Sequence, residues 1–192
     1  FSNYYAFAAL KDDGSIAVWG RSLAGGSTTS DNDYTGAPSS VTDVNDPSFN
    51  PIVNVFSTKY AFAALKEDGS IAVWGSISNG GSTTNGSTWT GAPSSVTDAS
   101  SGVVKVFSTD GAFAALKEDG SIAVWGWHAS GGSTTTYDTW TGAPSSVTGA
   151  SSGVIKVFSG KNAFATLKAD GSIVSWGLSS NGGSNAPSSG TY

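Results

Sequence analysis

Acidic residues followed directly by glycine are the most regular polar feature of this sequence. They occur at Asp13, Asp68, Asp119 and Asp170, and a glutamate precedes two of them, as Glu67 and Glu118. Carboxylates are oxygen ligands of calcium, but an EF-hand loop needs several such ligands at alternate positions and a distal glutamate, which are missing here. Asp-Gly is also a strong hairpin signal, because glycine accepts the positive φ that such turns need. We therefore predict that these residues form turns and bind no metal.

The single histidine, His128, stands beside Trp127. One histidine cannot form a histidine-based metal site, and no Ser/His/Asp arrangement has support in the sequence. Cysteine is absent, which excludes a disulfide, a thiolate zinc site and a cysteine nucleophile. We expect His128 to be an exposed loop residue. We also expect no catalytic residue, no cofactor and no enzymatic activity.

These residues sit within a repeat. The stretch 61–75 recurs, with small changes, at 6–20, 112–126 and 163–177, and the tryptophans that close the four copies lie 55, 51 and 51 residues apart. A fixed period of this length indicates a repeat architecture. We expect a single repeat domain over residues 1–192, with units at approximately 1–51, 52–102, 103–153 and 154–192.

Each recurring stretch reads as a buried hairpin. In the second copy, Ala61 to Lys66 and Ser70 to Trp74 are the two strands, with an Asp-Gly turn between them. Apolar residues occupy both faces of these strands, which means that both faces are covered. A helix is disfavoured because the apolar runs are short, Asp-Gly interrupts them, and Val, Ile, Phe and Trp dominate the second half.

A valine-rich strand precedes three of the four hairpins, as in Val103 to Phe107, and a weak fourth strand is expected near Pro-Ser-Ser-Val. Three or four short strands in each unit of this length match the size of a propeller blade. We predict an all-β fold: a tandem-repeat, β-propeller-like array of four blade-like units, each of three to four antiparallel strands.

The order Val-x-x-Val-Phe-Ser, Ala-Phe-Ala-x-Leu-Lys-x-Asp-Gly-Ser-Ile-x-x-Trp-Gly, a glycine pair and Pro before Val resembles the regulator of chromosome condensation repeat family. The resemblance implies β-propeller blades, and the family includes secreted bacterial members that inhibit β-lactamases. The chain departs from the family by its Phe-Ser in place of a glycine, by its shortened Gly-Gly segment and by having fewer units than is common.

Composition limits the partners. The net charge of −5 provides no basic surface for nucleic acid, and no apolar run approaches the length of a membrane span, so we expect neither nucleic-acid binding nor membrane insertion. An acidic, Ser/Thr/Gly-rich chain without cysteine favours an extracellular or cell-surface location. The chain begins inside a repeat, so we expect a processed product or a portion of a longer protein.

Segments that vary among near-identical units are candidates for binding, because loops on a rigid scaffold commonly carry recognition. They cover residues 21–24, 76–79, 127–130 and 178–181. The residues of interest in them are Arg21, Trp127, His128 and Leu178.

Tyr34, Trp89 and Trp140 share one place in their units, two residues before Gly-Ala-Pro. Such a row could stack on sugars or on a partner chain, or each ring could pack on the proline of its own blade; their faithful repetition favours packing. Asn85 begins an Asn-Gly-Ser sequon for N-glycosylation.

The chain ends lead to the functional hypothesis. Four hairpins share only three complete valine-rich strands, and an unpaired strand edge is a template for pairing with another chain. We expect a non-enzymatic extracellular structural repeat protein that self-assembles through its ends, as a filament or surface layer, or that is adhesive. A contact that closes would give a ring of two chains. The alternative is a propeller-type module that binds protein or glycan through its variable loops.

Overall fold

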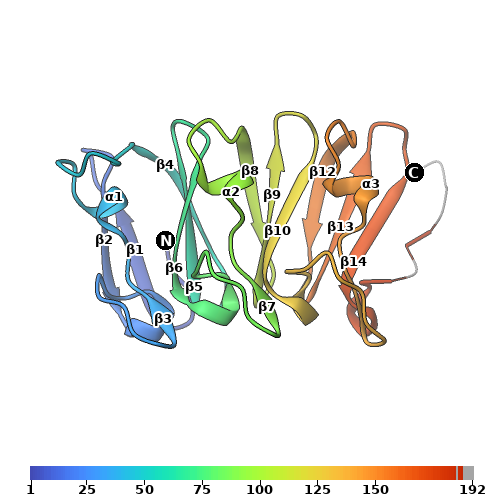
Figure 1. The fold of residues 1–192 in the computed structure, drawn as a ribbon, viewed down its shortest axis with the longest axis horizontal. Coiled ribbons are helices and arrows are strands. Elements are labelled where there is room, and N and C mark those ends of the chain that lie inside the picture. Colours follow the sequence, from blue (N-terminus) through green and yellow to red (C-terminus); the bar gives the residue numbers. More distant parts are fainter. Residues whose placement is uncertain (185, 188–192) are drawn as a thin grey trace.

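The computed structural model describes residues 1–184 and 186–187. It is an all-β row of four antiparallel sheets (Figure 1). The recurring hairpins are β1 (Ala6–Leu10) with β2 (Ile16–Gly20), β5 (Ala61–Lys66) with β6 (Ile71–Ser76), β9 (Ala112–Lys117) with β10 (Ile122–Trp127), and β13 (Ala163–Lys168) with β14 (Ile173–Leu178).

Three sheets add an inner and an outer strand to their hairpin. The inner strands are the valine-rich β4 (Ile52–Ser57), β8 (Val103–Ser108) and β12 (Val154–Ser159). The outer strands are β3 (Tyr34–Thr35), β7 (Trp89–Thr90) and β11 (Trp140–Thr141). We call the sheets blade 1 (β1-β2), blade 2 (β3-β6-β5-β4), blade 3 (β7-β10-β9-β8) and blade 4 (β11-β14-β13-β12). Each outer strand therefore comes from the repeat that precedes its blade.

The outer strand lies upstream of the place where we expected it. Pro-Ser-Ser-Val is not a strand but a short helical turn, in α1 (Ser39–Thr42), α2 (Ser94–Thr97) and α3 (Ser145–Thr148). The amides of Val41 and Thr42 both donate to the Pro38 carbonyl, at 3.1 and 3.2 Å, which closes the turn. Proline cannot donate a ladder hydrogen bond, so a strand does not continue through it.

The predicted hairpins are confirmed. In blade 2, Phe62 faces Trp74 across the strand pair, and Leu65 faces Ile71. The Asp68 carboxylate accepts hydrogen bonds from the Ser70 amide at 2.9 Å and from the Ser70 hydroxyl at 2.6 Å. This local bonding fixes the turn, which explains why an acidic residue recurs there.

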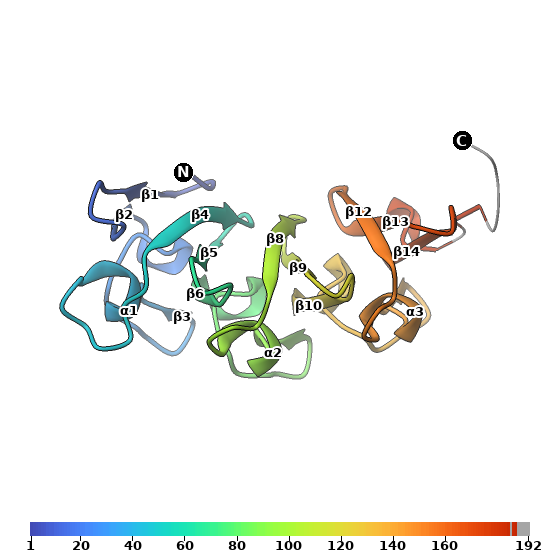
Figure 2. The ribbon, with the colours of Figure 1, turned by 90° about the horizontal axis from the view of Figure 1, so that it is seen from above.

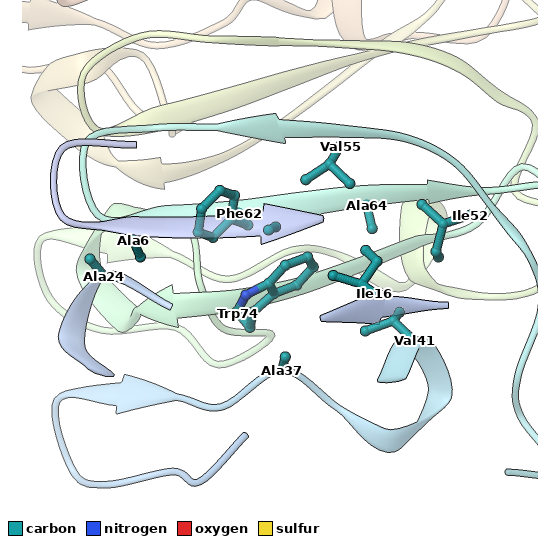
Figure 3. Close-up of a cluster of buried hydrophobic side chains, with 11 residues drawn as sticks. Ala6, Ile16, Ala24, Ala37, Val41, Ile52, Val55, Phe62, Ala64 and Trp74 are labelled. Atoms are coloured by element: carbon teal, nitrogen blue, oxygen red, sulfur yellow. The ribbon is translucent and has the colours of Figure 1, made fainter. Parts of the chain in front are cut away.

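The core lies between the blades, and both faces of the interior blades 2 and 3 are buried, as predicted. Phe62, Ala64 and Trp74 of blade 2 pack toward blade 1 (Figure 3). Ala61, Ala63 and Leu65, which alternate with them, pack toward blade 3. The alanines allow close approach of the sheets, and the stacked Phe62–Trp74 pair, with ring centroids 5.3 Å apart, fills the space between them.

The row of blades curves into an arc (Figure 2), with β4, β8 and β12 toward its concave side and α1, α2 and α3 toward its convex side. Blades 1 and 4 form opposite ends of this arc. In blade 1, Phe1 lies beside β1, because its amino group donates to the Ala8 carbonyl at 2.8 Å and the Ala8 amide donates back to the Phe1 carbonyl at 3.0 Å. Within the described residues, no helix has the length and apolarity needed to cross a membrane.

Candidate binding face

Two sets of connections meet at one end of the blades. The first set joins inner strand to hairpin, and the second follows each hairpin as the short 3-10 turns η1 (Ser22–Ala24), η2 (Ile77–Asn79), η3 (His128–Ser130) and η4 (Ser179–Asn181). We call this surface the loop face. It consists of residues 3–5, 58–60, 109–111 and 160–162 from the first set, and 21–24, 76–79, 127–130 and 178–181 from the second.

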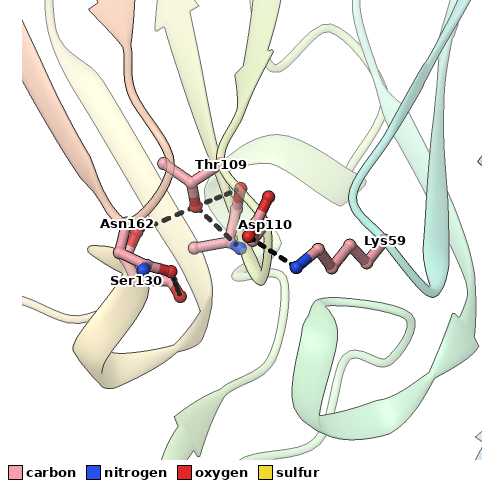
Figure 4. Close-up of polar contacts among 6 residues, drawn as sticks. Lys59, Thr109, Asp110, Ser130 and Asn162 are labelled. Carbon is pink, nitrogen blue, oxygen red and sulfur yellow. Dashed lines mark hydrogen bonds and ion pairs between the residues drawn. The ribbon is translucent and has the colours of Figure 1, made fainter.

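Buried threonines hold the two sets together. The Thr109 hydroxyl donates to the Ser130 carbonyl at 2.9 Å and accepts from the Ala112 amide at 3.1 Å (Figure 4). Thr58 makes the equivalent bond to the Asn79 carbonyl at 3.1 Å. Between blades 3 and 4, the Ser130 hydroxyl donates to Asn162 Oδ1 at 3.1 Å. These bonds fix the loop face on the blades beneath it.

A series of hydrogen bonds also links the blades across the loop face. The Tyr4 amide donates to the Lys59 carbonyl at 3.4 Å, the Lys59 amide to Asp110 at 3.0 Å, and the Asp110 amide to Lys161 at 2.8 Å. The same register therefore repeats from blade 1 to blade 4.

Two residues of this series, Lys59 and Asp110, also form an ion pair through their side chains. Lys59 Nζ lies 2.7 Å from Asp110 Oδ2 (Figure 4) and 5.3 Å from the centroid of the Tyr4 ring. The hydrogen bond to Asp110 raises the pKa of Lys59. Since the pair is near the surface, solvent and salt screen it, and we expect it to add little to stability. A groove of about 420 Å³ opens here, with Tyr4, Lys59 and Asp110 in its lining.

Aromatic rings are exposed on the same face. Tyr4, Tyr5 and Trp127 are large exposed side chains. Tyr5 stacks on Tyr60, with ring centroids 5.7 Å apart, and the Arg21 guanidinium lies 5.5 Å from the Tyr5 centroid. Rigid aromatic side chains and arginine are the residues that most often dominate protein interfaces.

Residues 3–5, 58–60, 109–111 and 160–162 were not among our candidates. The signal that finds them is the one that identified the second set of loops: their sequences, Asn-Tyr-Tyr, Thr-Lys-Tyr, Thr-Asp-Gly and Gly-Lys-Asn, differ between units whose flanking residues are almost the same.

The candidate residues of the second set do lie on the loop face. Arg21 and Trp127 are exposed, and Leu178 is half-buried. His128 is also half-buried, which corrects our expectation of an exposed residue. Its amide donates to the Thr88 carbonyl at 3.0 Å, which holds it against the connection before β7. Burial lowers the pKa of His128.

The row of Tyr34, Trp89 and Trp140 lies in the outer strands, and each member is half-buried. Trp89 is directly opposite Trp127, and Trp140 is opposite Leu178. The structure thus brings together two groups of candidate residues that belong to consecutive repeats. A Cβ on Gly86 would lie 2.3 Å from the Trp89 ring, so Trp89 packs against its own connection.

The acidic turns are at the opposite end of the strands from the loop face. Within the described residues, no group of three or more Asp, Glu or His side chains is placed to hold a metal ion. Asn85 is exposed, and its side-chain oxygen accepts a hydrogen bond from the Gly91 amide at 2.8 Å. Glycosylation of Asn85 stays a prediction.

Antiparallel blades in a row, three of them four-stranded here, with their inner strands on one side, are typical of a β-propeller. Yeast RCC1 (Prp20), solved with Kap60 bound to it, is similar at a TM-score of 0.57 and 18% identity, over 92% of this chain and 42% of that one. The CRINKLY WD40 ectodomain of the Arabidopsis thaliana receptor kinase ACR4 gives 0.52 and 15%, over 92% and 49%. Human WBSCR16 gives 0.50 and 19%, over 92% and 46%.

These similarities confirm the predicted RCC1-like β-propeller fold. The chain spans less than half the length of each of the three solved chains. No family model and no curated protein sequence matches it.

Proposed function

We propose that this chain is a non-enzymatic, extracellular structural repeat protein that assembles with copies of itself through its end blades, in a filament or surface layer or as an adhesive. The observation behind the proposal is the apolar face of blade 1. Phe7 and Trp19 on this face are 49% and 50% exposed, whereas their counterparts Phe62 and Trp74 are both 0% exposed.

The other end of the arc supports the same proposal. Phe158 of blade 4 is 57% exposed, whereas the equivalent Phe56 and Phe107 are partly buried against the next blade. The end blades thus expose apolar side chains whose counterparts in the interior blades are buried or partly buried. Apolar surface of this kind is typical of an association site. An extracellular setting is consistent with the acidic, cysteine-free composition and with the fold's occurrence in a receptor kinase ectodomain.

Light scattering and electron microscopy of the purified chain test the proposal. We expect particles larger than the 19.3 kDa chain, whose mass rises with concentration. Phe7→Ser should lower the measured particle mass, because it removes an apolar side chain from the exposed face of blade 1 through which the copies associate. Trp127→Ser is the matched control, since this exposed aromatic lies on the loop face. A mass of one chain at every concentration would refute self-assembly.

A second candidate function is binding of a protein or glycan through the loop face. It is favoured by the gathering of both variable loop sets, with Tyr4, Tyr5 and Trp127 exposed among them. Yeast RCC1, which shares the fold, binds Kap60. Protein and glycan arrays probed with the labelled chain test this candidate. Trp127→Ala should abolish a specific signal that Asp119→Ala, at the opposite end of the strands, retains.

A further inference from the structure

The three junctions between blades each contain the same kind of hydrogen bond. In each, the buried tryptophan of a blade donates its indole Nε1–H to a glycine carbonyl in the 3-10 turn of the preceding blade. The bonds run from Trp74 to Gly25 at 3.1 Å, from Trp125 to Gly80 at 3.2 Å, and from Trp176 to Gly131 at 3.1 Å. The junction therefore has a direction, because one blade supplies the donor and the other the acceptor.

Glycine is required at the acceptor position for two reasons. Gly80 adopts a left-handed φ of +94° where it ends η2, and a Cβ there would lie 2.7 Å from the Phe113 ring. The Phe-Trp pair of the next blade thus fits against the bare backbone of this turn. Gly25 and Gly131 have the same conformation and the same close contact.

The two ends of the arc carry the unmatched halves of this junction. Trp19 on blade 1 has the same stacking with Phe7, at 5.4 Å, but its indole N–H has no acceptor among the described residues. Gly182 ends η4 with a φ of +88°, and a Cβ on it would meet nothing within 4 Å in that part of the chain.

The series of backbone hydrogen bonds across the loop face also leaves one unmatched group at each end of the arc. Each of its bonds runs from an amide in one blade to a carbonyl in the next. The Tyr4 carbonyl, at the first position, receives no hydrogen bond from the described residues, and the Lys161 amide, at the last, donates none to them. A further junction of the same register would join the Lys161 amide to the Tyr4 carbonyl.

We propose that a second copy of this chain docks head to tail, with blade 1 of one copy on blade 4 of the other, in the register of the internal junctions. Trp19 of one copy donates to the Gly182 carbonyl of the second copy, and the Lys161 amide of that copy donates to the Tyr4 carbonyl of the first. Phe158 is then covered by blade 1. This inference rests on the proposed self-assembly and adds its polarity and contacts.

Complementation between two variants tests the polarity. Trp19→Ser removes the indole donor on blade 1, which is the head of the contact. Gly182→Val blocks the acceptor turn on blade 4, which is its tail. Each alone should lose association by at least about tenfold, because buried tryptophans and their pockets dominate interfaces. Mixed together, they should form a complex of two chains in a 1:1 ratio, since Trp19 of the Gly182→Val chain still fits the Gly182 turn of the Trp19→Ser chain.

Controls keep the result interpretable. Circular dichroism shows whether each variant is folded, and Phe158→Ser is a second tail variant at an exposed side chain in case Gly182→Val unfolds the last turn. Val104→Ser, at an exposed side chain of β8 in the interior blade 3, should associate as the unmodified chain does. If the unmodified chain stays a single chain, both self-assembly and the head-to-tail contact are wrong. If it associates but the mixture does not form a pair, or if Trp19→Ser has no effect, the head-to-tail contact alone is wrong.

Discussion

The Phe7–Trp19 and Phe62–Trp74 pairs have the same residues and the same place in a hairpin, yet different surroundings. Both pairs are directly cross-strand, and both are stacked, with centroids 5.4 and 5.3 Å apart. One pair is half-exposed and the other is fully buried. Strand pairing and stacking are therefore set within the hairpin, whereas burial is set by whether another blade stands before it.

This difference bears on stability. An isolated two-stranded hairpin is at best marginally stable in water, so the two-stranded blade 1 depends on burial against blade 2. The stability of such an array is approximately a sum of the stabilities of its units and of its nearest-neighbour interfaces. Identical residues should then contribute very different amounts at the end and in the interior.

The largest expected effect is that of truncating the interior tryptophan. Trp74→Ala should lower the free energy of unfolding by about 3–5 kcal/mol, because the change leaves a cavity in the core where Trp74 is fully buried. Trp19→Ala, measured where the protein is a single chain, should cost about 1 kcal/mol, mainly from the lost stacking on Phe7. Chemical denaturation of both variants measures the two values.

Equal losses for the two tryptophans would contradict the comparison. A loss below about 1 kcal/mol for Trp74→Ala would mean that the space between blades 1 and 2 closes without the indole.

The hairpins and their two buried faces could be predicted from sequence, because the Asp-Gly turn and the apolar pattern act within 15 residues. The outer strands could not. Tyr34 and Thr35 are only a two-residue strand, and their partners Ser76 and Gly75 belong to the next repeat. A pairing this short has no periodicity to detect, and tertiary contacts alone define it.

The candidate site was predicted in part for a similar reason. The second set of variable loops was identified from differences between units at Arg21, Trp127 and Leu178. The convergence of these loops with residues 3–5 and 58–60 depends on which strand ends share one end of a blade. Hydrogen bonds such as Thr58 to Asn79 join residues with no local sequence signal.

A smaller contrast is expected at the glycines that accept the indole. Gly80→Ala should cost about 2–5 kcal/mol, because strain at positive φ adds to a clash with Phe113. Gly182→Ala should cost only about 1–2 kcal/mol, since it carries the strain without the clash. The free energies of unfolding of the two variants measure the contrast. Similar values would mean that a further contact already fills the space beside Gly182.

The smallest contrast should be at the acidic turns, where end and interior should agree. The hydrogen bond from the Ser121 hydroxyl and, to a smaller extent, that from the Ser121 amide lower the pKa of Asp119. The hydroxyl and amide of Ser172 lower the pKa of Asp170 in blade 4 in the same way. The bond lengths are the same at both turns, 2.6 and 2.9 Å. This bonding lies within the turn, so the presence of a neighbouring blade should not change it.

The sign of the pH effect follows from these lowered pKa values. Below about pH 4 the unfolded chain takes up protons that the folded carboxylates still resist, so the stability from these turns is present above that pH and is lost as the pH falls through the folded pKa values. Asp119→Ala and Asp170→Ala should each flatten the acid side of the stability curve by a similar, small amount. Urea denaturation from pH 6 to pH 2 measures both slopes. A clearly larger change for Asp119→Ala would show that the interior turns also depend on the next blade, and the division between local turn and shared core would then be wrong.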